Sequence, residues 1–159
     1  MKKPKASTRR FVVDTNVFVA AIKPFTKKEN PAARKRKPSG ENTFTLLIRI
    51  ITDDGIELIG NARLVSEYRK LAKELNSPTS ALILEQLARK VEVTQVREEV
   101  IRRCKLYLPV KEAADVVHAA TCLQTGAILI TNDSDFDTIR DERLIEVWSI
   151  GRAIHQILS

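Results

Sequence analysis

The chain has 159 residues, 43% of them hydrophobic, which suffices for one domain with a core, and no stretch approaches the ~18 consecutive apolar residues of a membrane span. The net charge of +7 is uneven, because residues 1–40 contain twelve lysines and arginines against two acids, whereas the rest of the chain contains 15 against 18. The basic leading quarter suggests contact with a polyanion, although a solvated tail and loop would explain it equally well, and the acid surplus elsewhere argues against a simple nucleic-acid wrapper.

Two further features concern the compartment of the protein. The start, MKKPKASTRRF, is basic, but no uncharged apolar segment and no small-residue cleavage site follow it, so a signal peptide is not expected. Cys104 and Cys122 have no metal-type spacing and fall in helix-like segments, which favours buried free thiols over a disulfide. We therefore expect a cytoplasmic protein without membrane association.

The first third of the chain predicts a strand, a helix, a long loop and a second helix. Residues 10–14 (RFVVD) have the composition of a short buried strand with Asp14 at its C-terminal end, and residues 15–22 can form a helix. Residues 23–42 carry three prolines and seven basic side chains, which predicts a basic loop after a basic tail over residues 1–9. Residues 43–52 fit a helix, although their last five residues, IRIIT, also suit a strand.

The middle of the chain alternates strands with helices. Residues 56–60 (IELIG) predict a second strand after a DDG turn, and residues 61–75 form the clearest amphipathic helix, with Asn61 as its N-cap. A further helix is expected over residues 79–89, followed by a third strand at residues 90–93.

The last third continues this alternation. Helices are expected over residues 95–107 and 111–125, separated by Pro109, and strands over residues 126–131 and 144–150, with a terminal helix after them. Strands that are apolar on both faces and alternate with helices are typical of parallel sheets covered by helices. The sequence thus predicts an α/β fold: a single domain over residues 1–159, a three-layer α/β/α sandwich with a central, mostly parallel sheet of about five strands.

Acidic residues fall where such sheets carry their sites, just beyond the carboxyl ends of the strands. Asp14 ends the first predicted strand, and Asp133 and Asp135 follow the fourth. Asp115 and Glu67 lie on predicted helices and could join them. The simpler explanation for Asp115 is a favourable contact with the helix dipole.

The helical glutamate is ambiguous on periodicity alone. Glu67 lies at the edge of the apolar face of its helix, where it could equally be an exposed carboxylate paired with Arg63 or Lys70. Glu74 lies only ~20° further round the same edge and ~10 Å along the helix. The spacing does not choose between them.

Converging carboxylates would repel one another, and a divalent cation is the usual remedy. An oxygen-only donor set without a Cys/His cluster suits Mg²⁺ or Mn²⁺ rather than zinc. Other motifs fail, because no phosphate-binding glycine loop is present and DSDFDT lacks the glycine and glutamate of a calcium loop. A phosphorylatable receiver-type domain would need paired acids after its first strand and a later lysine, which DTN and TNDSD do not supply.

Three segments, VVDTNVF, SEY and ADVVHAATCLQTGAILITNDSDF, together resemble the PIN domain, the nuclease fold of VapC-type toxins. The resemblance spans nearly the whole chain, from Phe11 to the terminal helix. Its most specific part runs from Asp115 to Phe136, with an acid, two alanines, a buried strand that begins at a glycine, and then T-N-D-x-D-F.

This resemblance implies roles for the acids. The four catalytic, metal-binding acids of the family match Asp14, Glu67, Asp115 and Asp133, where Glu67 is preferred to Glu74 for its S-E-Y context. Asp135 matches the acid before the phenylalanine, a supporting or second-metal position. The implied cofactor is Mg²⁺ or Mn²⁺.

Other matched positions are polar. Asn16 and Thr131 match residues that orient the carboxylates, and His118 is more simply a hydrogen-bonded helix histidine than a metal ligand. The loop at 23–42 looks longer and more basic than in compact toxins of the family. We expect it to contact RNA phosphate through the run Arg34, Lys35, Arg36, Lys37.

The resemblance also implies a function. PIN-like nucleases cleave RNA in a metal-dependent reaction in which water attacks the phosphodiester in line and leaves 5′-phosphate and 3′-hydroxyl ends. It further implies a toxin of a type II toxin–antitoxin pair, a homodimer that its antitoxin holds inactive. The alternatives are a PIN-fold RNA-processing nuclease outside any such pair, and an RNA-binding module that does not cut. Retention of all four acids argues against the binding module, because degenerate members lose one or more.

Overall fold

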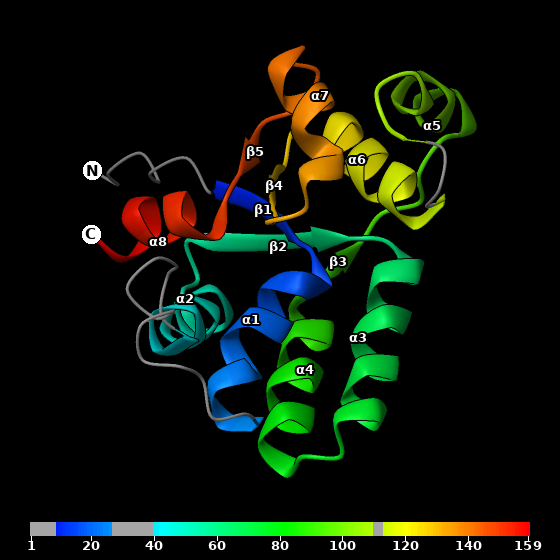
Figure 1. Ribbon diagram of the computed structural model, residues 1–159. Helices are drawn as coiled ribbons and strands as arrows, with labels where there is room; N and C mark the ends of the chain where they lie inside the picture. The colour runs from blue at the N-terminus through cyan, green and yellow to red at the C-terminus, as the bar shows by residue number, and fades with distance from the viewer. Residues whose placement is uncertain (1–8, 27–39, 110–112) are drawn as a thin grey trace, which may run out of the picture.

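The computed structural model describes residues 9–26, 40–109 and 113–159, and Figure 1 shows how its helices and strands are arranged. Strands alternate with one or two helices along the chain. In chain order the elements are β1 (Arg9–Val13), α1 (Thr15–Thr26), α2 (Gly40–Thr52), β2 (Ile56–Gly60), α3 (Ala62–Leu75), α4 (Pro78–Lys90), β3 (Glu92–Val93), α5 (Glu98–Lys105), α6 (Ala113–Thr125), β4 (Ile128–Ile130), a 3₁₀ turn (Ser134–Phe136), α7 (Asp137–Asp141), β5 (Val147–Trp148) and α8 (Ile150–Leu158).

The described strands form one parallel five-stranded sheet in the order β3-β2-β1-β4-β5. The chain runs from β1 outward to β3, then crosses back to place β4 on the other side of β1. The order of the strands therefore reverses between β1 and β4. The predicted α/β fold with a parallel sheet is confirmed.

Helices cover both faces of the sheet (Figure 1). Helices α1 to α4 lie on one side, where α1 packs on α2 and α3 on α4. On the other side α6 contacts β1, β2 and β4 and carries α5 on its outer surface. Helix α8 returns beside α2 and closes the sheet at β5.

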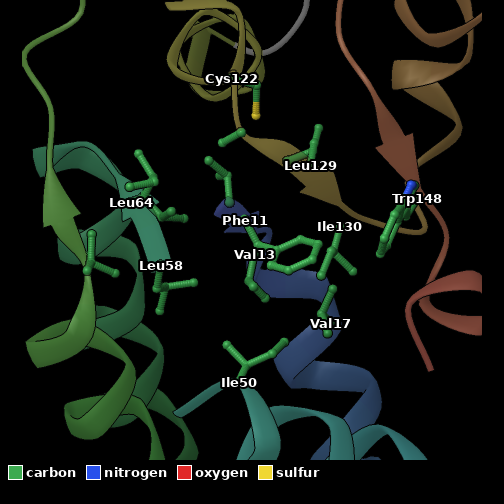
Figure 2. Close-up of a cluster of buried hydrophobic side chains, with 14 of the residues drawn as sticks. Phe11, Val13, Val17, Ile50, Leu58, Leu64, Cys122, Leu129, Ile130 and Trp148 are labelled. Atoms are coloured by element: carbon green, nitrogen blue, oxygen red, sulfur yellow. The ribbon is translucent and has the colours of Figure 1, made fainter. Parts of the chain in front are cut away.

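The core lies on both faces of the central strand, where Phe11, Val12 and Val13 are completely buried. Figure 2 shows side chains of β1, β2 and β4 gathered at the sheet, with Val17 and Ile50 on one face and Cys122 on the other. Cys104 and Cys122 are buried free thiols, as predicted, and burial raises the pKa of Cys104 to about 11.

Several predicted boundaries were wrong by a few residues. The first strand ends at Val13, so Asp14 follows it, and the strands at 90–93, 126–131 and 144–150 are shorter than expected. A strand extends only as far as a neighbour supplies hydrogen bonds, whereas its apolar sequence continues into the adjoining turns. Residues 48–52, the ambiguous IRIIT, belong to α2.

The predicted basic loop at 23–42 is helical at both ends, because α1 continues through residue 26 and α2 begins at Gly40. A proline inside a helix removes one backbone hydrogen bond, and α1 continues past Pro24 in spite of this loss. The four predicted RNA contacts, Arg34, Lys35, Arg36 and Lys37, lie outside the described residues, as does the predicted tail apart from Arg9. Within the described ranges, no helix has the length and apolar character needed to cross a bilayer.

Candidate active site

The candidate site lies at the carboxyl ends of β1 and β4, where the strand order reverses. Ligands of open parallel sheets bind at this kind of position, because the connections from the two neighbouring strands diverge to opposite faces. Val13 pairs with Ile130 in the parallel register, and the backbone N–H of Asp14 donates to the Ile130 carbonyl at 3.1 Å. The register therefore places Asp14 beside Thr131.

The hydroxyl of Thr131 organises this edge. Its Oγ1 donates to Oδ2 of Asp14 at 2.8 Å and accepts hydrogen bonds from Nδ2 of Asn16 at 3.1 Å and from the backbone N–H of Asp133 at 3.0 Å. Asp14 and Thr131 are 7% and 3% exposed. One buried hydroxyl thus joins the loop after β1 to the loop after β4.

The Asp14 carboxyl is in an unfavourable place for a negative charge. Burial raises its pKa above the usual range, and the charges of Glu67 and Asp133 add to the rise, against the Thr131 hydrogen bond and, when its ring is protonated, the charge of His118. Those two other acids therefore lie close enough to act on it.

Three further carboxylates form a tight group. Asp115 in the first turn of α6, Asp133 after β4 and Asp135 in the 3₁₀ turn each present an oxygen, and these oxygens all lie within 4.8 Å of one another. Oδ1 of Asp133 accepts the backbone N–H of Asp135 at 2.9 Å, which starts that turn and fixes both acids. Asp14 and Glu67 do not belong to this group of three.

Glu67 projects from α3 toward α6. Its two carboxylate oxygens lie 3.3 and 3.1 Å from Nε2 of His118, so its partner is this histidine rather than Arg63 or Lys70. Glu74, in contrast, is exposed and pairs with Lys70 at 3.9 Å. The structure therefore separates two glutamates that periodicity left equivalent.

Two supporting contacts were not predicted from the sequence. The buried Tyr68 hydroxyl donates to the Val13 carbonyl, next to Asp14, and burial raises the pKa of this phenol so that it remains a donor. Asn61 is the N-cap of α3, as predicted, but its side chain also lies 3.1 Å from Nδ1 of His118. Spacing offers no signal for this contact, because the two residues are 57 positions apart.

The described part of the site offers oxygen donors suited to a hard divalent cation. It also contains one buried side-chain atom without a hydrogen-bond partner, Oδ1 of Asn16. The amide nitrogen of the same side chain is held by Thr131, which leaves the oxygen as an unsatisfied acceptor two residues after Asp14 in the chain. A cation with its coordinated waters fits both observations, because the ion balances the charges and a water supplies a donor.

The PIN domain family model matches residues 11–142. Solved structures with the same fold include VapBC2 from Rickettsia felis bound to a DNA fragment from their promoter (13% identity, TM-score 0.54, covering 88% of this chain and 98% of that one). VapBC-1 from nontypeable Haemophilus influenzae has 18% identity and a TM-score of 0.55, and FitAcB from Neisseria gonorrhoeae has 20% and 0.56. Both cover 89% of this chain and 98% of their own. No curated protein sequence matches the chain.

Proposed function

The chain belongs to the PIN domain family, and we propose that it is a metal-dependent endoribonuclease that acts as the toxin of a toxin–antitoxin pair. PIN domains are generally nucleases. The single observation that carries the proposal is the acidic edge itself, where Asp115, Asp133 and Asp135 converge beside the buried Asp14. Such a concentration of negative charge opposes folding unless it serves to hold a cation.

We propose Asp14, Glu67, Asp115, Asp133 and Asp135 as the residues that hold Mg²⁺ or Mn²⁺. Two oxygens on opposite sides of an Mg²⁺ ion stand about 4.2 Å apart. The chosen oxygens of the three carboxylates lie within 4.8 Å of one another, which is compatible with one ion. When bound, such an ion lowers the pKa of water and stabilises the oxygen that leaves the phosphate.

The roles of the other side chains follow from their contacts. Thr131 holds Oδ2 of Asp14 by a hydrogen bond at 2.8 Å, whereas Oδ1 accepts a longer one, at 3.4 Å, from the Thr15 hydroxyl. In the proposed site Oδ1 would face the cation. Asn16 fixes the Thr131 hydroxyl through its amide nitrogen. In the proposed reaction water adds to the phosphorus, the bond to the 3′ oxygen breaks, and the products carry a 5′-phosphate and a 3′-hydroxyl.

The proposed partners are RNA, an antitoxin protein and a second copy of the chain, in a cytoplasmic setting. The antitoxin is supported by the structural relatives of this fold, VapBC2, VapBC-1 and FitAcB. The RNA contact would include Arg34, Lys35, Arg36 and Lys37, in a leading quarter that carries twelve basic residues. Neutralising these four residues should weaken RNA binding and flatten its dependence on salt concentration.

The test is cleavage of labelled single-stranded RNA by the purified chain in Mg²⁺ or Mn²⁺, with and without a chelator. Asp14→Asn and Asp115→Asn should each lower the rate by two orders of magnitude or more, that is, ~3 kcal/mol. Glu74→Gln is the matched control, because it removes an exposed carboxylate from the same helix as Glu67. Cleavage that survives chelation, or survives in both aspartate variants, would refute the metal-dependent nuclease.

The same samples distinguish the alternatives. RNA that binds but stays intact with every metal tested would favour the non-cleaving module. Cleavage without growth arrest on expression, and without rescue by a neighbouring small protein, would favour a processing nuclease over a toxin.

A further inference from the structure

A chain of three side chains connects the end of β2 to Glu67. Asn61 follows β2, His118 lies in α6 and Glu67 lies in α3, so the chain joins three elements. Nδ2 of Asn61 is 3.1 Å from Nδ1 of His118, and Nε2 of His118 is 3.1 Å from the nearer Glu67 oxygen. Asn61 and His118 are 4% and 1% exposed.

The surroundings of Asn61 determine which atoms carry the protons. Its Oδ1 accepts the Leu64 backbone N–H at 2.8 Å as the N-cap of α3, so the amide nitrogen points the other way, toward α6. The Thr121 hydroxyl donates to the Val117 carbonyl and is therefore an acceptor for the same amide nitrogen, at 2.9 Å. Both contacts make Nδ2 the group that faces the His118 ring.

A donor at Nδ1 fixes the tautomer of the ring. Nδ1 of His118 accepts from Asn61, so in the neutral ring the proton sits on Nε2 and is donated to Glu67. Both ring nitrogens are then occupied, and neither has a free lone pair for a metal ion. His118 is thereby excluded as a ligand in this arrangement.

A neutral donor has a specific advantage for a carboxylate that binds a cation. An arginine or lysine in the same place would orient Glu67 but also neutralise its charge, and would compete with the ion. In the neutral ring, the His118 N–H fixes the carboxylate and leaves its negative charge in place. Hydrogen bonds of this kind commonly orient the ligands of metal sites.

We propose that Asn61 and His118 are positioning residues, which hold the Glu67 carboxylate in the orientation required for metal binding. This inference rests on the proposed function, because it takes Glu67 as a ligand. Neither residue touches the substrate or the ion; each acts through the next member of the chain.

The test measures Mn²⁺ affinity by titration calorimetry on the full chain without RNA. His118→Leu should weaken binding about 10–100-fold. His118→Gln should restore most of it, since its amide can place an N–H where Nε2 was. Asn61→Ser keeps an N-cap side chain but loses the contact with the ring, and should show a smaller loss. Glu67→Gln gives the reference for complete removal of the ligand.

Ser77→Ala is the control for an effect on folding alone. It removes the N-cap of α4, whose Oγ accepts the Ser80 N–H, and should lower the melting temperature without changing Mn²⁺ affinity. The proposal is overturned if Glu67→Gln weakens binding while His118→Leu and Asn61→Ser leave it at the wild-type value. It is also overturned if His118→Gln binds as weakly as His118→Leu. A wild-type chain that binds no Mn²⁺ would overturn the proposed function as well.

Discussion

Replacement of Thr131 by valine removes the hydroxyl that joins the two loops of the site and nearly preserves the side-chain volume. The hydroxyl donates to the buried Asp14 carboxylate and accepts from Asn16 and from the backbone of Asp133. A hydrogen bond to a charged group contributes about 1.5–3 kcal/mol and each neutral one about 0.5–1.5 kcal/mol, although contributions within one network do not add fully.

We therefore expect Thr131→Val to lower the free energy of unfolding by about 3 kcal/mol near pH 8. For a chain of this size such a loss corresponds to a fall of about 6–12 °C in melting temperature. Thr131→Ser is the matched control, because it keeps the hydroxyl and loses one methyl group, at a cost of about 1 kcal/mol.

The effect should also depend on pH in a defined direction. Burial raises the pKa of Asp14 in the folded protein, so this group stabilises the fold fully below its unfolded pKa of about 4, and that contribution is lost as pH rises through the folded value. The Thr131 hydrogen bond limits this rise, and its removal raises the folded pKa further. The difference between Thr131→Val and Thr131→Ser should hence be larger at about pH 8 than at about pH 5.

Thermal unfolding of the metal-free proteins, followed by circular dichroism, measures both the loss of stability and its dependence on pH. Equal melting temperatures for Thr131→Val and Thr131→Ser would show that the hydroxyl contributes nothing. If the two variants differ in melting temperature by the same amount at both pH values, the hydroxyl does not act on the charge of Asp14, and the reasoning is refuted.

Three further substitutions probe single features. Asp14→Asn removes a carboxyl group whose burial raises its pKa and makes its ionised form unfavourable in the folded protein. The metal-free variant should therefore melt above the wild type at neutral pH, while RNA cleavage is lost. A lower melting temperature would contradict this. Tyr68→Phe removes a buried donor to the Val13 carbonyl and should cost about 1–3 kcal/mol in urea unfolding, whereas an unchanged midpoint would rule that contribution out. Lys90→Met deletes an ammonium that donates to backbone carbonyls at the end of α2, including that of Asp53, and should cost about 1–2 kcal/mol; a melting temperature equal to that of the wild type would speak against it.

The strand-helix alternation predicted the fold because buried parallel strands are apolar on both faces and stand out from amphipathic helices. Residues 56–60 and the helix after Asn61 were found almost to the residue. The IRIIT ambiguity is resolved by packing, because in the structure Leu46, Leu47 and Ile50 are buried at helical spacing while Ile48 is exposed. In a strand, buried and exposed side chains would alternate along the chain.

Strand ends were less predictable, because hydrogen bonds to distant neighbours set them. The 3₁₀ turn and α7 were missed, although an aspartate placed directly after a strand, as Asp133 is, often accepts the backbone N–H two residues on and so closes a turn.

The site residues that directly follow strands were predictable from the sequence. Asp14, Asp133 and Asp135 were placed at one edge by the parallel topology, and the structure has them there. Glu67 could not be chosen over Glu74 from the helix period, since only the fold brings His118 to one of them. The Asn61 contact is likewise a product of tertiary packing.

The most direct test of a metal-dependent ribonuclease is a titration of the wild-type chain with Mn²⁺. Occupancy is measured by calorimetry, and RNA cleavage is measured over the same concentrations. We expect the cleavage rate to rise with occupancy over one range of Mn²⁺, and both to be lost together in Asp115→Asn. Full occupancy without cleavage, or cleavage without bound ion, would contradict a metal-dependent ribonuclease at this acidic edge.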